Sequence, residues 1–584
     1  MNDKNIYFDF LYNFIDITKV PFTARGSRLL VMKSADGLVI RQSREPRIAE
    51  SKSAPDFQSD LLSNLKFRDE FGDELPVVVQ SQPHILNLET KLGEMVLVFE
   101  DTETILLSLP ENSIRIEFEV SLRHAKADWR GAEFTNTGVD RFRMAYTTNK
   151  PILGNSITKI ENDRYKIELE LDKGPGSLKI NITPRLGLNR YIPEINPIVH
   201  RAAQEWYDWF ERVPKVEPHL ERYYYYAWWV MRAGLMSTRY FLTREALASS
   251  KMHSTSVWQW DAFLHACAFR FVDRKLSHDQ IRILLDHQLE DGMIPAAVHD
   301  NGIVINREQL SDIEIKNPPM LAWTVLRIYR SDGDKEFLAE IYEKLSKWNS
   351  WWLGQFQRNS PDFEAAESIN DFDDDTSDPF EKTKLVGSPD LNTYLYLQIR
   401  CMAEIASALD RTDETIAWNA MAEDLLGQMR DALQDSQSGL LWTYQQGIAV
   451  CVPTPASLLP LIVGEDNDEL SHKALEHFRD NKGIWQDSPV PSIALDDPKF
   501  QSEEYWKGPS WVSMNLLLME GLDRSGNSEL ANQLCERTLE RMLAGISRAS
   551  KEDENTDYAP IFGWAASLLI EFAIRSSRQK IKNS

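Results

Sequence analysis

Apolar and polar residues alternate with a period of two from residue 1 to about residue 195. The segments SIRIEFEV (113–120), RYKIELELD (164–172) and SLKINITP (177–184) each place their apolar side chains on one face of a strand. The segment LLVMKSADGLVIRQ (29–42) predicts a hairpin that turns at Asp36-Gly37. One-faced strands separated by turn signals favour an antiparallel β-sandwich.

From about Pro197 the apolar period becomes helical, and no strand pattern of any length interrupts it. A dozen helices with longer loops between them predict an (α/α)6 barrel. A HEAT- or TPR-like solenoid would show a fixed repeat of about 34 to 47 residues, and the chain shows none. The predicted helices lie near 199–212, 218–240, 258–272, 277–289, 319–331, 335–354, 390–408, 413–434, 466–480, 508–523, 528–545 and 563–577.

These two patterns predict an α+β multidomain protein. With 584 residues the chain is too long for one ordinary core. We expect an N-terminal β-sandwich over residues 1–195, a linker helix over 196–214, and an (α/α)6 barrel with the chemistry over 215–584.

Charge and composition exclude several classes of partner. The net charge of −24 argues against nucleic acid and anionic membranes, and no phosphate-binding glycine motif supports a nucleotide cofactor. We expect no cofactor and no metal. The chain has 17 Trp, which suit stacking against sugar rings, although most of them belong to a helical core on the simpler reading.

The four cysteines and the start of the chain bear on location. Cys267, Cys401, Cys451 and Cys535 are far apart with apolar neighbours, so we expect buried thiols in a reducing compartment. The start MNDKNIYFDFLYNF has acids where a signal peptide has a basic region. Both features favour a cytoplasmic protein, and a homo-oligomer is compatible with them.

Candidate chemistry is concentrated in short motifs at predicted helix starts and in loops. In chain order they are WQWD (258–261), HQLEDGMIP (287–295), PPMLAW (318–323), an acidic ESIND loop (367–371), DLN (390–392), YWKGPSW (505–511) and FGW (562–564). Taken singly, each has a structural explanation: Asp261 could cap a helix, and Asp291-Gly292 could form a turn.

In this order the motifs resemble glycoside hydrolase family 63, over roughly Tyr223 to Phe572. That family includes processing α-glucosidase I and mannosylglycerate and glucosylglycerate hydrolases, and it is similar to the trehalases of family 37. The resemblance implies an (α/α)6 catalytic barrel, often with an N-terminal β-sandwich. It also implies inverting, exo-acting, α-glucosidase-like hydrolysis of a small α-linked carbohydrate.

The resemblance identifies Asp371 as the general acid. Inverting hydrolysis needs one carboxylic acid to protonate the leaving oxygen and one carboxylate to activate water. Glu367-Ser368 match the head of the family pattern ESGxDDSP, and crowded carboxylates would raise the pKa of the acid. Ile369 departs from the pattern, and Asp373, Asp374 or Asp375 becomes the acid if the alignment slips. A calcium loop and a solvated acidic loop are the alternatives.

The resemblance identifies Glu554 as the general base, with Glu552 as the second candidate. Family members carry a Glu shortly before the last helix, and this chain has KEDENTDYAPIFGW (551–564) there. The segment is shorter than in the family, and four acids within six residues could be solvated surface.

The remaining motifs would line the sugar pocket, where polar groups read hydroxyls and aromatic faces fill space. Trp323 and Trp511 could instead be core residues. By resemblance, the wall residues are Trp258, Trp260, Asp261, Gln288, Asp291, Trp323, Asn392, Tyr505, Trp506, Lys507, Gly508, Trp511 and Trp564. A trehalase, an α-L-rhamnosidase and a non-catalytic sugar-binding relative stay open as alternatives.

Overall fold

The computed structural model divides the chain into two compact units. Unit 1 comprises residues 1–213, 219–238 and 247–256, and unit 2 comprises 214–218, 239–246 and 257–584. The domain boundaries expected at residues 195 and 215 remain predictions. The structure describes residues 6–43, 60–136, 142–160, 164–305, 319–359, 367–368, 386–387, 389–433, 440–445, 448–452, 454–458, 461, 469–480, 483–485, 489–500, 508, 510–549 and 562–583.

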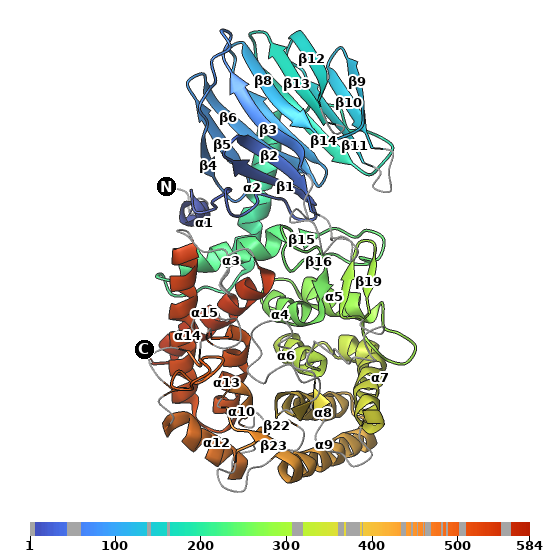
Figure 1. The fold of residues 1–584 in the computed structure, drawn as a ribbon, viewed down its shortest axis with the longest axis vertical. Coiled ribbons are helices and arrows are strands. Elements are labelled where there is room, and N and C mark those ends of the chain that lie inside the picture. Colours follow the sequence, from blue (N-terminus) through green and yellow to red (C-terminus); the bar gives the residue numbers. More distant parts are fainter. Residues whose placement is uncertain are drawn as a thin grey trace. The chain divides into compact units, whose positions relative to one another are not determined.

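Unit 1 contains two antiparallel sheets (Figure 1). The first has the order β1-β2-β3-β8-β13-β12 and the second β4-β5-β6-β7-β14-β11-β10-β9. The strands are β1 (Leu29–Ser34), β2 (Gly37–Gln42), β3 (Asp60–Arg68), β4 (Val78–Ser81), β5 (Leu86–Thr90), β6 (Gly93–Asp101), β7 (Thr104–Leu109), β8 (Ile114–Val120), β9 (His124–Asp128), β10 (Gly131–Thr135), β11 (Arg143–Thr148), β12 (Ile152–Ile160), β13 (Arg164–Leu171) and β14 (Gly176–Thr183).

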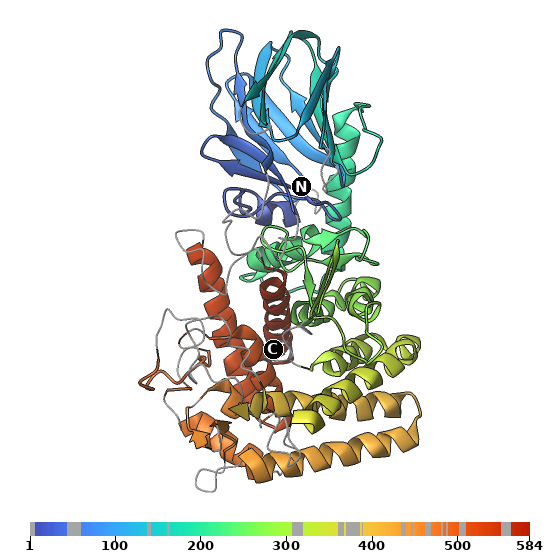
Figure 2. The same ribbon diagram turned by 45° about the vertical axis from the view of Figure 1, so that its right-hand side comes forward.

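The two sheets meet through the apolar faces that the alternation predicts. In β8 every second residue is buried and the residues between them are partly exposed. Phe118 of β8 packs edge-to-face on Tyr146 of β11 with ring centroids 5.3 Å apart, which joins the sheets from opposite layers (Figure 2). The predicted N-terminal antiparallel β-region is therefore confirmed.

Two details of the β-region differ from the sequence prediction. Ser34 pairs with Gly37, so the turn residues of the predicted hairpin are Ala35 and Asp36. Strand β14 is buried on both faces. Its Lys179 is buried with the strand, reaches Glu100 at 2.6 Å and donates to Asn189 at 3.0 Å. A buried lysine is tolerated when its ammonium group is paired in this way.

Three helices belong to unit 1: α1 (Ile6–Leu11), α2 (Ile195–Arg212) and α3 (Glu221–Ala233). Ile198 of α2 packs into a cluster with Val98 and Leu106 of the second sheet. The helix predicted over 218–240 ends at Ala233 because Gly234 closes it with a backbone bond to Val230.

A helical region follows, as predicted (Figure 1). Its helices are α4 (Gln259–Phe269), α5 (Arg274–Leu285), α6 (Leu321–Asp332), α7 (Lys335–Asn359), α8 (Pro389–Ala408), α9 (Thr412–Leu433), α10 (Pro455–Leu458), α12 (Glu469–Asp480), α13 (Val512–Arg524), α14 (Ser528–Ala549) and α15 (Gly563–Asn583).

Six of these helices contact one another in a closed cycle. Helix α4 contacts α6 and α15, α8 contacts α6 and α10, and α13 contacts α10 and α15. The helices α5, α7, α9, α12 and α14 each contact members of this cycle. The chain therefore alternates between the six helices of the cycle, called here the cycle helices, and helices that pack against them.

Long and short connections alternate in the same way. Four connections that leave a cycle helix have two to four residues: 270–273, 333–334, 409–411 and 525–527. Connections this short make each of these cycle helices antiparallel to the helix that follows it. The connections that lead into a cycle helix are longer, and each ends at the N-terminus of its cycle helix: 286–320, 360–388, 434–454, 481–511 and 550–562.

The structure corrects further sequence predictions in this region. Helix α5 begins at Arg274 rather than near 277, because the Asp273 side chain caps it by accepting from Leu276 N at 3.0 Å. Short strands do interrupt the helices: β15 (Leu235–Met236), β16 (Ala246–Leu247), β17 (Val257–Trp258), β18 (Ala297–His299), β19 (Gly302–Val304), β20 (Glu367–Ser368), β21 (Val386–Gly387), β22 (Thr443–Gln445) and β23 (Ile448–Val450). Cys451 is exposed, whereas the other three thiols are buried.

Candidate active site

Every residue predicted to act on the sugar belongs to the N-terminal ends of the cycle helices. Each lies either in the first turn of such a helix, at its N-cap, or in the long connection before it. Loops of this kind, held by a rigid scaffold, commonly carry function. The motifs are scattered from residue 258 to residue 564, and along the chain each stands at or before the start of a cycle helix.

The motif WQWD opens helix α4. Trp258 is its N-cap residue, and β17 pairs with β18 so that Trp258 lies opposite Ala297. Trp258, Trp260 and Asp261 are all half-buried. Side chains that are partly covered and partly accessible suit the wall of a pocket better than the centre of a core.

Gln259, between the two tryptophans, joins this motif to the next one. Its side-chain amide donates to the carbonyls of Ile294 and Pro295, both at 2.9 Å, and its backbone N–H donates to Ala296 O at 3.0 Å. The ends of WQWD and HQLEDGMIP are thus held together. The sequence analysis did not select Gln259, although its place inside WQWD was the available signal.

Gln288 and Asp291 use their side chains to build a turn. Gln288 donates to the carbonyls of Gly292 and Lys344, both at 2.9 Å, and Asp291, which is exposed, accepts from Met293 N at 3.2 Å. Gly292 has φ +98°, and a Cβ there would lie 2.4 Å from Lys347 O, so only glycine fits. Sugar contacts by Gln288 and Asp291 remain a prediction.

Trp323 lies in the first turn of α6 and is 3% exposed. Its indole N–H donates to Glu520 at 2.9 Å, and the Arg327 guanidinium covers its ring at 4.8 Å. Asn392, in the first turn of α8, is fully buried. The contacts of Trp323 agree with the packing role that the sequence left open for it, and sugar contacts by Trp323 and Asn392 remain predictions.

The last wall residues flank α13 and α15. Trp511 is the N-cap residue of α13 and is 8% exposed, whereas Trp564, the second residue of α15, is half-buried. Gly508 is buried in the connection before α13. Tyr505, Trp506 and Lys507 lie outside the described residues.

The candidate catalytic residues also lie outside the described residues: Asp371, its alternatives Asp373, Asp374 and Asp375, and the base candidates Glu552 and Glu554. The segments beside them are described. Strand β20 ends at Ser368, three residues before Asp371, and belongs to the sheet β20-β21-β22-β23. The acidic segment thus begins at a strand that is fixed on a sheet.

His265 is a buried polar residue of α4, one turn after Asp261 on the same helix face. It is fully buried, and neither ring nitrogen has a hydrogen-bond partner in the part of the chain that the structure describes. Burial lowers the pKa of His265 to about 3, so the ring is neutral at ordinary pH. The sequence analysis quoted this residue within its motif without assigning it a role.

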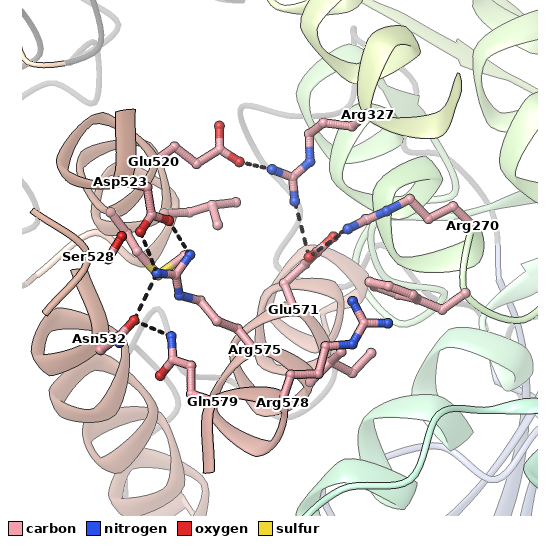
Figure 3. A pocket seen from close by; sticks show the side chains of 14 residues that line it. Arg270, Arg327, Glu520, Asp523, Ser528, Asn532, Glu571, Arg575, Arg578 and Gln579 are labelled. Carbon is pink, nitrogen blue, oxygen red and sulfur yellow. Dashed lines mark hydrogen bonds and ion pairs between the residues drawn. The ribbon is translucent and has the colours of Figure 1, made fainter. Parts of the chain in front are cut away.

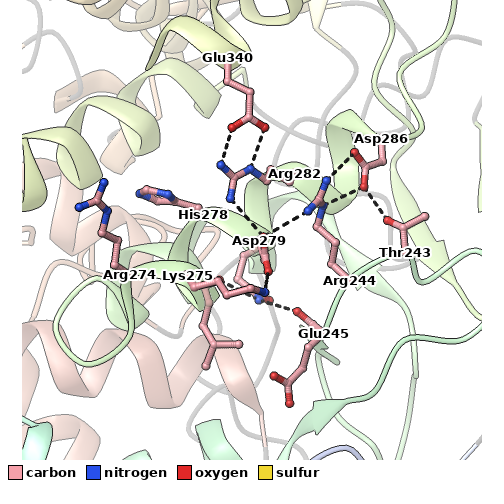
Figure 4. Close-up of polar contacts among 12 residues, drawn as sticks. Thr243, Arg244, Glu245, Arg274, Lys275, His278, Asp279, Arg282, Asp286 and Glu340 are labelled. Atoms are coloured by element: carbon pink, nitrogen blue, oxygen red, sulfur yellow. Dashed lines mark hydrogen bonds and ion pairs between the residues drawn. The ribbon is translucent and has the colours of Figure 1, made fainter. Parts of the chain in front are cut away.

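A second charged cluster, around Asp279 of α5, differs from the candidate site because its charges are matched (Figure 4). The Asp279 carboxylate is almost fully buried and pairs with Lys275 at 2.5 Å and with Arg282 at 3.3 Å. Arg282 also holds Glu340 of α7, and Arg244 binds Asp286 at 2.9 Å. These pairs tie α5 to α7 and to the 243–246 segment.

Two classes of feature are absent from the described residues. They contain no group of three or more His, Cys, Asp or Glu side chains that could hold a metal ion. None of their helices is long and apolar enough to cross a membrane.

Comparison with known proteins supports the resemblance seen in the motifs. The family model "Mannosylglycerate hydrolase MGH1-like glycoside hydrolase domain" matches residues 254–361 and 357–555, which together are more than half of the chain. Mannosylglycerate hydrolase MGH1 of Selaginella moellendorffii is 23% identical over 353 residues, which cover 47% of this chain and 71% of that protein.

Two further relatives come from other organisms. A mannosylglycerate hydrolase of Thermus thermophilus is 26% identical over 151 residues, covering 24% of this chain and 34% of that protein. A probable mannosyl-oligosaccharide glucosidase of Schizosaccharomyces pombe is 26% identical over 142 residues, covering 23% of this chain and 18% of that protein.

Among solved structures, a GH63 mannosylglycerate hydrolase from a second strain of Thermus thermophilus, in complex with glucose, is similar to this chain, with a TM-score of 0.45 and 18% identity. The match covers 60% of this chain and 99% of that chain. By the family model, which spans the motifs from WQWD to YWKGPSW, the chain belongs to the MGH1-like glycoside hydrolases of family 63.

Proposed function

We propose that this glycoside hydrolase cleaves a small α-linked glycoside from its end, with inversion, in an (α/α)6 barrel. Six helices in a cycle, with partner helices packed against them, support that architecture. The observation that carries the proposal is that along the chain each motif stands at or before the start of a cycle helix.

In the proposed mechanism, Asp371 protonates the leaving oxygen while Glu554, or alternatively Glu552, removes a proton from the attacking water. The water attacks the anomeric carbon from the face opposite the leaving group, which requires carboxyl groups roughly 6.5–9.5 Å apart. Because two carboxyl groups suffice for this reaction, we propose no cofactor. The half-buried Trp258, Trp260 and Trp564 supply flat faces for the sugar ring.

The proposed substrate combines two lines of support. The relatives named mannosylglycerate hydrolases suggest a mannoside of a small acid, and the relative named as a probable mannosyl-oligosaccharide glucosidase suggests a glucosidase activity. We therefore propose a small α-linked carbohydrate with mannosylglycerate as the first compound to test. A cytoplasmic location and a homo-oligomeric state remain predictions.

A panel of glycosides read by NMR tests this proposal. Mannosylglycerate, glucosylglycerate, trehalose, an α-glucoside and an α-rhamnoside are incubated with the enzyme, and the first anomer released is recorded. Early release of the β anomer from an α-linked glucoside or mannoside supports the proposal. Early release of the α anomer contradicts inversion, and binding without turnover of any compound favours a non-catalytic sugar-binding protein.

A further inference from the structure

A cavity of about 500 Å³ lies at the other end of the cycle helices (Figure 3). It is bordered by the end of α4, by α6, α13 and α15, and by the start of α14. On α15, Arg578 follows Trp564 by fourteen positions, which is about 21 Å along a helix axis. Arg578 is therefore distant from Trp564, whereas the other side of the cavity, at Glu520 and Arg327, contacts Trp323.

The cavity is lined by a surplus of cations. Four arginines line it, Arg270, Arg327, Arg575 and Arg578, against the three carboxylates of Glu520, Asp523 and Glu571. The whole chain carries a net charge of −24. A cavity with one excess positive charge is unusual on such a surface and favours an anion.

The three carboxylates are already engaged by the other arginines. Glu571 is held by Arg270 and by Arg327, the latter at 3.1 Å. Glu520 also pairs with Arg327. Asp523 receives both Arg575 amino groups, one at 2.5 Å and one at 3.0 Å. Figure 3 draws these pairs as dashed lines, and none of them reaches Arg578.

Arg578 is the lining residue whose charge is not neutralised. It is exposed, its guanidinium lies 5.6 Å from the centre of the Phe271 ring, and no carboxylate of the described residues pairs with it. The buried Nε atoms of Arg327 and Arg575 likewise lack an acceptor within the described part of the chain. Arg578 is thus the arginine whose guanidinium is open to a ligand, and the lining also holds Ser528 and Asn532.

The favourable placement of cations at helix C-termini explains the position of Arg270 but not that of Arg578. Cations near the last carbonyls of a helix are favourable, and Arg270, the C-cap residue of α4, donates to Cys267 O. Arg578 makes no such bond. Its position over an aromatic ring at the cavity edge leaves its donors directed to a ligand or to water.

We propose that this cavity is a second ligand site, for a small anion carrying a carboxylate or phosphate group, with Arg578 as its main contact. The volume is in the range of small-molecule sites. Planar guanidinium groups bind both oxyanions through paired N–H donors. The apolar lining by Leu516, Met519 and Ile574 would accommodate a carbon skeleton, and the proposal does not depend on the glycosidase mechanism.

Isothermal titration of the full chain tests the site, with inorganic phosphate and glycolate as separate probes at constant ionic strength. Saturable binding of at least one probe is expected, and the stronger probe identifies the oxyanion preferred. Arg578→Gln should weaken that binding about ten-fold or more, since a charge-assisted hydrogen bond is lost. Lys580→Gln removes the same charge two residues away, outside the cavity lining, and should change binding less than two-fold.

A second variant works by repulsion. Ser528→Glu places a carboxylate at the first position of α14, where acids favour helix formation, so the protein should fold and lose anion binding. Thermal unfolding without ligand checks that each variant is folded. The proposal is overturned if neither probe binds saturably to the unmodified chain, or if Arg578→Gln and Lys580→Gln weaken binding equally.

Discussion

The two ends of the cycle helices carry different chemistry on the same scaffold. At the N-terminal ends, where long connections lead into the helices, half-buried tryptophans such as Trp258 and Trp564 are found. At the opposite end, connections are short, and guanidinium groups meet buried carboxylates such as Glu571. One helix can serve both ends because Trp564 and Glu571 lie on the same α15.

This difference predicts two kinds of mutant. Groups at the N-terminal ends are proposed to act in binding, so their loss should alter kinetic constants more than folding. Arginine and carboxylate side chains at the C-terminal ends form buried ion pairs, so the loss of one partner should lower the free energy of unfolding. Kinetic constants and unfolding free energies measured on the same variants show whether the two kinds of mutant differ.

The largest effect is expected for Asp371→Asn. General acid catalysis contributes about 10²–10⁴-fold, so kcat on a natural glycoside should fall by that factor or more. The melting temperature should remain close to that of the unmodified protein, because a residue of the acidic segment is proposed to act in chemistry alone. Steady-state kinetics and thermal unfolding of the same preparation check both parts.

Variants of the neighbouring acids serve as controls for Asp371. Asp373→Asn, Asp374→Asn and Asp375→Asn should each retain most of the activity. If one of these lowers kcat instead while Asp371→Asn turns over normally, the acid has been assigned to the wrong residue of the segment.

Glu571→Gln should give the opposite signature. Burial would raise the pKa of Glu571, but Arg270 and Arg327 outweigh it and hold the pKa below its ordinary value of 4.5. Removing the charge leaves the buried Arg270 without its carboxylate and Arg327 with Glu520 alone, and breaking a buried pair typically costs about 3–5 kcal/mol. Denaturant unfolding should show that loss at pH 7, with little change in the KM of the folded enzyme.

The pH dependence sharpens this second prediction. Because the folded pKa of Glu571 is lower than the unfolded one, the stabilisation is fully present above about pH 4.5 and is lost as the pH falls towards the folded pKa. The gap between the unmodified protein and Glu571→Gln should therefore narrow on acidification. Glu404→Gln is the control, since its pair with Arg330 is exposed and should contribute little. A gap that stays constant down to low pH would contradict the ion-pair account.

The tryptophans at the N-terminal ends should divide according to burial. Trp323 is 3% exposed and bonded to Glu520, so Trp323→Ala should cost about 3–5 kcal/mol of stability. Trp258 is half-buried, so Trp258→Ala should raise KM with a smaller loss of stability. A collapsed melting temperature with normal KM for Trp258→Ala would make it a core residue.

Periodicity was enough to predict the long helices, but it missed α10 (Pro455–Leu458), a cycle helix of four residues that is too short to show a period. The predicted helices from 258 onwards all occur, because a buried stripe at helical spacing has few alternative structures. Boundaries moved where one side chain decides them, as Asp273 does for α5. The strands of two or three residues, such as β17 and β20, were missed because they are too short to show a period.

The sequence predicted which residues belong to the candidate site better than it predicted the contacts that these residues make. Motif order placed Trp258 and Trp564 at helix starts, where the structure has them. The motifs could not reveal that Gln288 bonds to Lys344 O, because this contact joins the turn to a helix more than fifty residues further along. No sequence motif marks the cavity around Arg578, because its charged residues come from helices that are far apart in the sequence.

Gln259→Leu should have the smallest effect and tests whether the motifs cooperate. The variant deprives the carbonyls of Ile294 and Pro295 of a donor, at a cost of about 1–2 kcal/mol. If this bond holds WQWD against the neighbouring motif, KM should rise several-fold beyond what the lost stability explains. Gln280→Leu is the matched control, since Gln280 is also buried and donates to two backbone carbonyls, but on α5. Equal stability losses with a KM change in Gln259→Leu alone would place the effect at the candidate site. Equal KM changes in both variants would mean that general loosening of the helices, and not the junction of the two motifs, controls binding.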